Sequence, residues 1–255
     1  MPTTSAKSLA LVIRVVEFSE TSLVATLFTR DFGKIGALAK GAKRLKSPFE
    51  SALDLLALCR IVFLHKSSEA LDILTEAKLI RRFRPPGKDL NALYTGYYVA
   101  ELLDGLTKED DPNPELFDLA DQTLALLTAG AEPAAKLTVH FELSALKLLG
   151  HVPAVEHCVE CGETIPATAG PTAFGLLDGG VLCPRCRGGK KEVMAIGADV
   201  LRMINLLADP FGQAWQRIKM NHRAYTELRR LLDRYLAHLL GREAKLRRYL
   251  PRTEG

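Results

Sequence analysis

Short apolar segments follow one another along the first third of the chain: residues 9–18 are rich in β-branched residues, and residues 22–29 alternate between apolar and polar with the two-residue period of a β-strand. Turn signals such as Asp31-Phe32-Gly33 separate these segments. The predicted strands cover residues 9–18, 22–29, 35–39, 53–64 and 71–79. Five short strands in this length predict a five-stranded Greek-key OB-fold barrel, a common scaffold for binding single-stranded nucleic acid.

Beyond Pro85-Pro86-Gly87 the apolar residues recur with a period near 3.6, which is typical of amphipathic helices. Helices are predicted over residues 90–106, 115–128 and 133–149, and a further helix carries an apolar stripe from Leu228 to Leu240. Pro133 suits a first helical turn, and Gly150 suits a helix end. The sequence therefore predicts an α+β protein in which a barrel is followed by an all-α helical domain.

Four cysteines interrupt the helical part in two Cys-x-x-Cys pairs, Cys158/Cys161 and Cys183/Cys186. Two such pairs about twenty residues apart have the layout of a zinc ribbon. Four thiolates complete a tetrahedral shell, so we expect one structural zinc ion and no catalytic metal. Two disulfides, four free thiols or a redox pair are the alternatives. His157 adjoins the first pair. Because the four cysteines already fill the coordination shell of the metal, we expect His157 to lie outside that shell.

These patterns divide the chain into four parts: an OB-fold at residues 1–82, helical segments at 83–150 and 193–255, and a zinc-ribbon insert at 151–192. We find neither a signal-peptide core nor an apolar run of the ~20 residues that span a bilayer. A cytoplasmic protein without membrane contact is therefore expected, with reduced thiols that favour metal over disulfides. The fifth cysteine, Cys59, lies in an apolar run and is expected to be a core residue.

The formal net charge is only +4, but the charges are strongly segregated. Basic residues gather between Arg30 and Lys46, between Lys78 and Lys88, and along the C-terminal stretch, whereas residues 101–121 are acidic. Segregated cations predict a polyanion as partner. The predicted DNA-binding residues are Arg30, Lys34, Lys40, Lys43, Arg44, Lys46, Arg81 and Arg82.

Three further interpretations follow from this charge pattern. Phe28, Phe32 and Phe49 bracket the first basic run as possible stacking platforms, although a strand residue such as Phe28 is more often part of the core. The arginine-rich C-terminal helix can add a second strand-binding face. The acidic stretch at 101–121 is expected to be solvated, and a docking site for a basic partner is the alternative. A solvated charged loop remains the alternative interpretation of the basic run itself.

We find no motif of an enzyme. Residues 36–41 resemble the opening of a phosphate-binding loop, but Ala42 and Lys43 occupy the positions that need lysine and Ser or Thr. Four histidines are scattered at helical positions without a nearby nucleophile: His140, His151, His222 and His238. We therefore expect no catalytic activity.

The order barrel, helices, four-cysteine insert and helices resembles the RecO family of bacterial recombination mediators over nearly the whole chain. The most specific parts are Thr29–Lys34 leading into Lys40–Arg44, and the cysteine quartet within a helical domain. The resemblance implies a DNA repair and recombination mediator that is cytoplasmic and associated with the nucleoid. It would bind single- and double-stranded DNA, anneal complementary strands, and with RecR help load RecA onto gaps coated by the single-stranded-DNA-binding protein SSB.

Not every member of that family keeps the cysteines, so a metal-stabilised version is implied here. The acidic C-terminal tail of SSB is a further implied partner, and it needs an apolar pocket rimmed by cations, which we expect in the helical domain near residues 217–230. The alternative is a zinc-containing regulator that reads specific duplex sequence. Such a regulator would contact base edges at one site, whereas a mediator binds strands with little sequence preference.

Overall fold

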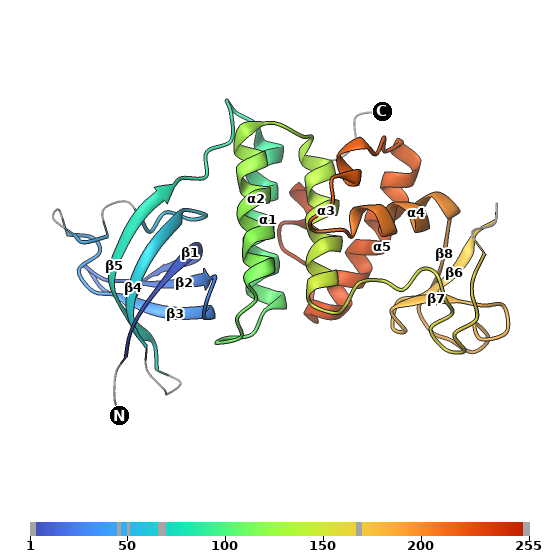
Figure 1. Ribbon diagram of the computed structural model, residues 1–255, viewed down its shortest axis with the longest axis horizontal. Coiled ribbons are helices and arrows are strands. Elements are labelled where there is room, and N and C mark those ends of the chain that lie inside the picture. Colours follow the sequence, from blue (N-terminus) through green and yellow to red (C-terminus); the bar gives the residue numbers. More distant parts are fainter. Residues whose placement is uncertain (1–3, 45–46, 50–51, 66–69, 167–169, 252–255) are drawn as a thin grey trace. The chain divides into compact units, whose positions relative to one another are not determined.

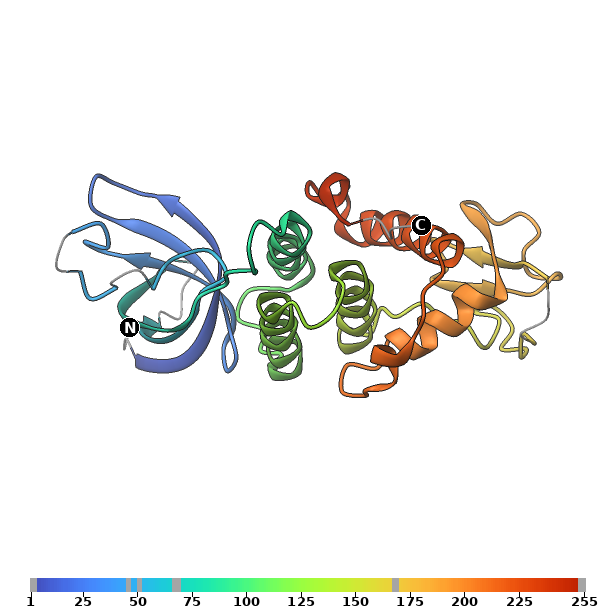
Figure 2. The ribbon, with the colours of Figure 1, turned by 90° about the horizontal axis from the view of Figure 1, so that it is seen from above.

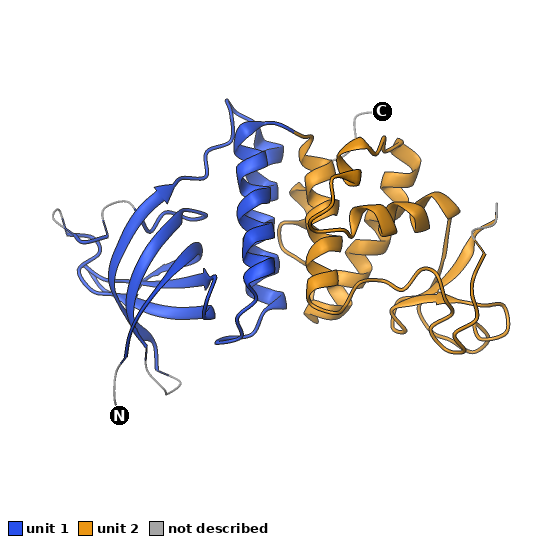
Figure 3. Cartoon of the chain, viewed as in Figure 1, with its two compact units in different colours: residues 1–131 blue, residues 132–255 orange. Residues whose placement is uncertain are grey.

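The computed structural model describes residues 4–44, 47–49, 52–65, 70–166 and 170–251. The chain forms two compact units, Met1–Ala131 and Glu132–Gly255, coloured separately in Figure 3. Each unit is described by itself below. Among the described helices, none combines the length and the apolar character that crossing a membrane requires.

The first unit begins with a closed five-stranded barrel (Figure 1). Its strands are β1 (Thr4–Glu17), β2 (Leu23–Thr29), β3 (Gly33–Ala39), β4 (Leu58–His65) and β5 (Asp72–Arg81). They close in the order β1-β2-β3-β5-β4, in which β3 and β5 run parallel and the other neighbours antiparallel. The predicted barrel is confirmed. Its interior holds alternate residues of the strands, including Val12, Leu27, Ile35 and Phe63.

Two predicted strand starts are wrong. The first strand is predicted from Leu9, but β1 begins at Thr4. Residues 53–57 are as apolar as a strand, but β4 begins only at Leu58. Leu56 has a positive φ of 64°, and its N–H donates to the Val12 carbonyl over 2.7 Å. Leu53 and Leu56 therefore belong to a turn that covers the barrel. Their side chains are buried there, so these apolar residues leave water without forming a strand.

Two helices, α1 (Leu90–Leu106) and α2 (Pro114–Ala129), pack side by side against the outside of the barrel (Figures 1 and 2). Asp89 caps α1 by accepting the Ala92 N–H, and Asn113 caps α2 by accepting that of Leu116. Phe28, on the outer side of β2, packs against Phe117 with ring centroids 6.2 Å apart. Outward-facing residues of the barrel thus form a second core with the helices.

The second unit contains α3 (Ala134–Leu148), α4 (Ala198–Leu207) and α5 (His222–Leu240), with two short 3-10 turns, η1 (Ala214–Arg217) and η2 (Arg247–Tyr249). A three-stranded sheet of β6 (Thr172–Gly175), β7 (Gly180–Leu182) and β8 (Val193–Ile196) lies at one end of this unit, in the order β7-β6-β8 (Figures 1 and 2). Residues 135–146 of α3 are all buried, and α3 packs against α4 within this unit. The helices predicted around the insert are confirmed, and α4 is an additional one.

Candidate functional site

The four cysteines of the insert form one compact cluster. Their sulfur atoms all lie within 4.8 Å of one another, and Cys161 Sγ is 3.8 Å from Cys183 Sγ. Tetrahedral zinc with Zn–S bonds of about 2.3 Å separates its sulfur ligands by about 3.8 Å. All four cysteines are free thiols. The cluster can therefore hold a metal ion, and the disulfide alternative does not describe it.

Two tight turns create this arrangement. The Gly162 N–H donates to the Cys158 carbonyl over 2.8 Å at a positive φ of 73°, and the Cys186 N–H donates to the Cys183 carbonyl over 3.1 Å. The Cys183 N–H points across to Cys158 Sγ at 3.3 Å. This hydrogen bond is the main cause that lowers the pKa of the Cys158 thiol to about 6. The backbone therefore favours the thiolate of Cys158, whereas hydrogen bonding with the Cys183 and Cys161 sulfurs raises the pKa of the Cys186 thiol to about 12.

The insert has little apolar core of its own. Its buried cluster consists of Cys158, Leu182 and Cys183, with Ile165 and Ala173 packed partly against it. Cations nearby are paired with carboxylates, as Lys190 is with Asp178 and Glu160, and Arg185 is with Glu163. His157 is outside the group of four possible ligands and forms a backbone bridge with Thr164. A core this small gains little stability from apolar burial, and a metal ion held by the four cysteines can add to it.

The basic loop that follows β3 lies at the rim of the barrel. Gly41 turns the chain with a positive φ of 71°, and Lys40, Lys43 and Arg44 are exposed. The Lys43 Nζ donates to Glu17 Oε1 over 2.8 Å, a contact that lies in solvent. Lys40 and Arg44 have no ion pair within the described part of the chain, and Lys46 lies outside it. Three exposed cations on one loop can bind phosphate groups.

Three other predicted DNA-binding residues lie beside carboxylates of the first unit. Arg30 makes two hydrogen bonds of 2.9 Å to the carboxylate of Asp118 on α2, and Arg81 pairs with Asp121. Arg82 Nε lies 3.6 Å from Asp54. The side chains of these three arginines are 41%, 36% and 32% exposed, so they border the surface while they hold their carboxylate partners.

Lys34 is buried. Its Nζ donates to the carbonyls of Asp104 and Thr107 over 2.5 and 2.8 Å, at the C-terminal end of α1. These carbonyls form the negative end of the helix dipole, where a cation is stabilised. Gly33 beside it approaches the Asp111 backbone so closely that a Cβ atom would clash. Asp104, Asp118 and Asp121 of the acidic stretch thus pair with cations of the barrel, whereas Glu109, Asp110, Asp111 and Glu115 are exposed as expected.

The predicted stacking platforms are not available. Phe28 and Phe49 are buried, and Phe32 packs edge-on against Phe63 of the barrel interior with ring centroids 5.3 Å apart. In contrast, Phe18 lies in the turn between β1 and β2 and is 62% exposed. The sequence offered a signal for Phe18, because a phenylalanine directly before the polar run Ser19–Ser22 lies where a strand ends.

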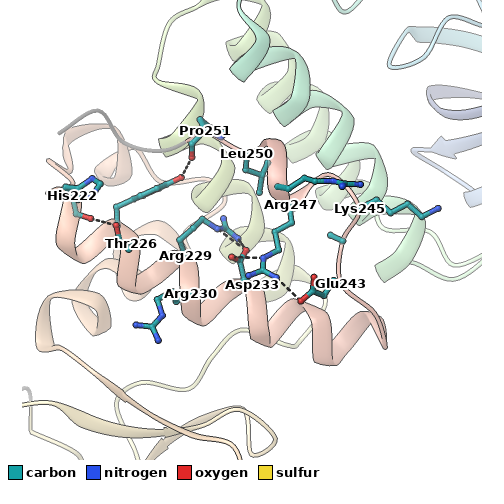
Figure 4. Close-up of a pocket in the computed structure, with 13 residues that line it drawn as sticks. His222, Thr226, Arg229, Arg230, Asp233, Glu243, Lys245, Arg247, Leu250 and Pro251 are labelled. Atoms are coloured by element: carbon teal, nitrogen blue, oxygen red, sulfur yellow. Dashed lines mark hydrogen bonds and ion pairs between the residues drawn. The ribbon is translucent and has the colours of Figure 1, made fainter.

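The C-terminal arginines surround a cavity of about 720 Å³ between α5 and residues 243–251 (Figure 4). Arg229 donates to the fully buried carboxylate of Glu142 and to Asp233, and Asp233 also pairs with Arg247 at 2.9 Å. Arg247 also pairs with the exposed Glu243 at 2.9 Å, so the network holds three acids and two arginines and reaches from the interior to the surface. Of the C-terminal arginines predicted to add a second DNA face, Arg229 on α5 and Arg247 on η2 are thus held by carboxylates of the same unit.

Other lining residues give the cavity a mixed character. Tyr225, Leu250 and Pro251 supply apolar surface, and the Tyr225 hydroxyl donates to the Pro251 carbonyl over 2.7 Å. Arg230 and Arg248 add cations, the latter 5.3 Å from the centre of the Tyr249 ring. Apolar surface bordered by cations can receive a peptide that carries both acidic and apolar groups.

Comparison with known proteins assigns both halves of the chain. The family description "Recombination protein O N terminal" matches residues 1–83, and "Recombination protein O C terminal" matches residues 87–248. The chain belongs to the RecO family. RecO proteins are DNA repair proteins and not a family of catalytic enzymes.

Individual RecO relatives align over nearly their full length. The DNA repair protein RecO of Rhodopirellula baltica is 39% identical, over 95% of this chain and 98% of that protein. That of Halalkalibacterium halodurans is 30% identical over 97% and 95%, and that of Anaeromyxobacter dehalogenans strain 2CP-1 is 33% identical over 96% and 95%. The resemblance to RecO proteins stated from the sequence is confirmed.

Proposed function

We propose that this member of the RecO family is a cytoplasmic, nucleoid-associated mediator that binds single- and double-stranded DNA and anneals complementary strands. With RecR it would help load RecA onto gaps coated with SSB. The observation that carries the DNA-binding part is the barrel rim, where Lys40, Lys43 and Arg44 are exposed on one loop of an OB-fold.

The cations of the barrel would have two different roles. Lys40, Lys43 and Arg44, together with Lys46, would contact phosphates directly. Arg30, Arg81 and Arg82 would border that path, since each is held by a carboxylate that a phosphate would have to displace. Lys34 would keep the barrel attached to α1.

Neutralised phosphates explain how such a surface can promote annealing. Two complementary strands repel each other through their phosphates, and cations that bind the phosphates weaken this repulsion. The contacts would be non-specific, because phosphates carry no sequence information. Binding to one particular duplex sequence would instead favour the zinc-containing regulator.

The rim can be tested with the triple variant K40A/K43A/R44A. For single-stranded DNA, we expect the magnitude of the slope of log K against log salt concentration to fall by about 2, since each lost phosphate contact contributes ~0.7 to that slope. Annealing of SSB-coated strands should slow in parallel. The matched control K88A/K191A/K219A removes three other exposed cations and should leave the slope unchanged. An unchanged slope in the rim variant would remove the rim from the DNA path.

We further propose that Cys158, Cys161, Cys183 and Cys186 hold one structural zinc ion within the insert at residues 151–192. The four thiols match a tetrahedral thiolate shell in number and spacing, and the insert has a very small core. The ion would supply folding free energy and no chemistry, because four thiolates leave no open coordination position.

The zinc proposal predicts a large change in the variant C158S. Structural zinc sites contribute about 10–16 kcal/mol in small zinc modules, so the insert should lose its ion and unfold while the barrel stays folded. Native mass spectrometry reports the ion, and hydrogen exchange of residues 151–196 reports the fold. The control C59A replaces a buried cysteine outside the quartet and should keep the zinc. A parent protein without metal, with C158S exchanging as the parent does, would contradict the proposal.

We also propose that the acidic C-terminal tail of SSB binds the cavity beside α5. The cations of the cavity would pair with the acidic residues and the terminal carboxylate of the tail. The apolar surface of the cavity would receive the aromatic residue at the tip of the tail. A fluorescent tail peptide should bind R230E at least tenfold more weakly than the parent. The control R202E reverses another exposed charge of the same unit and should bind as the parent does. Equal affinities for both variants would place the tail elsewhere.

A further inference from the structure

Phe18 is one of the most exposed large apolar residues of the described chain. It follows the last residue of β1, and its N–H donates to the Ser22 carbonyl over 3.1 Å, which fixes the turn into β2. We propose that Phe18 is a base-stacking platform that lets the barrel rim prefer single-stranded to duplex DNA. This inference rests on the proposed function of the rim as a DNA-binding surface.

The apolar surface continues from Phe18 across the barrel. Val16 lies two residues earlier on β1 and is 45% exposed, and successive side chains of a strand alternate between its two faces. Val16 pairs with Val24 on β2, and Val24 pairs with Leu38 on β3; both are partly exposed. Exposed apolar side chains that follow one register line give the bases of a strand a surface to lie on.

Hydrogen bonds join this turn to the basic loop. The Lys43 N–H donates to the Thr21 carbonyl over 3.0 Å, and the Gly41 N–H donates to Ser22 Oγ over 3.3 Å. The Lys43 ammonium also pairs with Glu17, the neighbour of Phe18. The aromatic ring and the exposed cations therefore lie on the same rim, as binding of bases and phosphates by one strand requires.

The ring provides the discrimination that cations lack. Single strands and duplexes both carry phosphates, so cations that bind phosphates do not by themselves distinguish single-stranded from duplex DNA. A base in a duplex is already stacked on its neighbours, whereas a base in a single strand can place its face on an aromatic side chain. Phe18 should therefore add affinity for single strands only.

The variant F18A tests the proposal. Base stacking on one aromatic residue contributes about 1–3 kcal/mol, so F18A should bind an oligothymidine roughly 5- to 150-fold more weakly. Its affinity for duplex DNA and for an abasic oligonucleotide of the same length should not change, and neither should the salt slope. F18L keeps an apolar side chain without the aromatic face and should behave as F18A does.

Two controls accompany these variants. F211A removes a phenylalanine of the second unit that is also 62% exposed, and it should bind every probe as the parent does. F18W should keep the affinity, and its fluorescence should be quenched by oligothymidine but not by the abasic probe. The natural Trp215 is buried, and the parent protein provides its background signal.

The outcomes separate this inference from the proposed function. Equal weakening of single-stranded, duplex and abasic binding by F18A would show a damaged loop, and unchanged binding would show that Phe18 contacts no base; either result overturns the stacking role. If K40A/K43A/R44A still weakens binding in those cases, the DNA-binding rim stands. Normal DNA binding by F18A together with lost annealing of SSB-coated strands would assign Phe18 to a protein partner and also overturn the inference.

Discussion

The barrel rim and the surface of α5 are both rich in cations, yet their cations are used differently. At the rim, Lys40 and Arg44 extend into solvent without an ion pair in the described residues, and Lys43 has only a solvent-exposed partner. Beside α5, Arg229 and Arg247 are held by Glu142 and Asp233 in a largely buried network. A basic run in a sequence therefore shows where cations lie, but not whether they are available to a ligand.

The largest effect is expected where the ion pair is buried. E142Q keeps the shape of the side chain but removes the charge that compensates Arg229, and breaking a buried pair costs about 3–5 kcal/mol of the free energy of unfolding. The matched rim variant E17Q removes the carboxylate of an exposed pair and should unfold as the parent does. Urea unfolding of both variants measures the contrast.

Equal stability of E142Q and E17Q would contradict the distinction between the two surfaces. Improved DNA binding by E17Q alone would sharpen it, because Lys43 would then be released toward a phosphate. The salt slope should rise in that case, since one more cation takes part in binding.

The sequence predicts those features of the structure whose determinants lie close together along the chain. The helix at 90–106 is predicted to the residue, because Pro85-Pro86-Gly87 precedes it and its apolar period is local. The cysteine quartet is equally visible, since spacing within each pair sets the turn. In contrast, α4 is missed because it has only ten residues directly after the insert.

Long-range charge pairing is what the sequence could not show. Lys34 meets the end of α1 across 70 residues, and Arg30 meets Asp118 across 88. Nothing in the local pattern distinguishes these cations from Lys40 or Arg44. Pairing with distant carboxylates, and burial in the case of Lys34, distinguishes these cations from Lys40 and Arg44, and both are properties of the packed barrel and helices.

An intermediate effect is expected for Lys34. K34M keeps the length of the side chain but leaves the carbonyls of Asp104 and Thr107 without their donor, which costs about 1–3 kcal/mol. K40M changes an exposed residue and should alter the free energy of unfolding by at most ~0.5 kcal/mol. The two variants should have the opposite order of effects on DNA binding, measured at temperatures where both are folded. K40M should weaken DNA binding, and K34M should not. If K34M weakened DNA binding with an unchanged unfolding curve, the buried lysine would have to be a ligand contact after all.

The smallest effect tests whether an engaged cation can be made available. Asp118 holds Arg30 through two exposed hydrogen bonds, so D118N should leave the unfolding curve unchanged while it frees the guanidinium. One added phosphate contact would raise the salt slope of single-stranded DNA binding by ~0.7. The double variant R30A/D118N should return the slope to that of the parent. A slope that D118N does not change would mean that Arg30 lies off the DNA path, and that the exposed loop after β3 binds the strand without it.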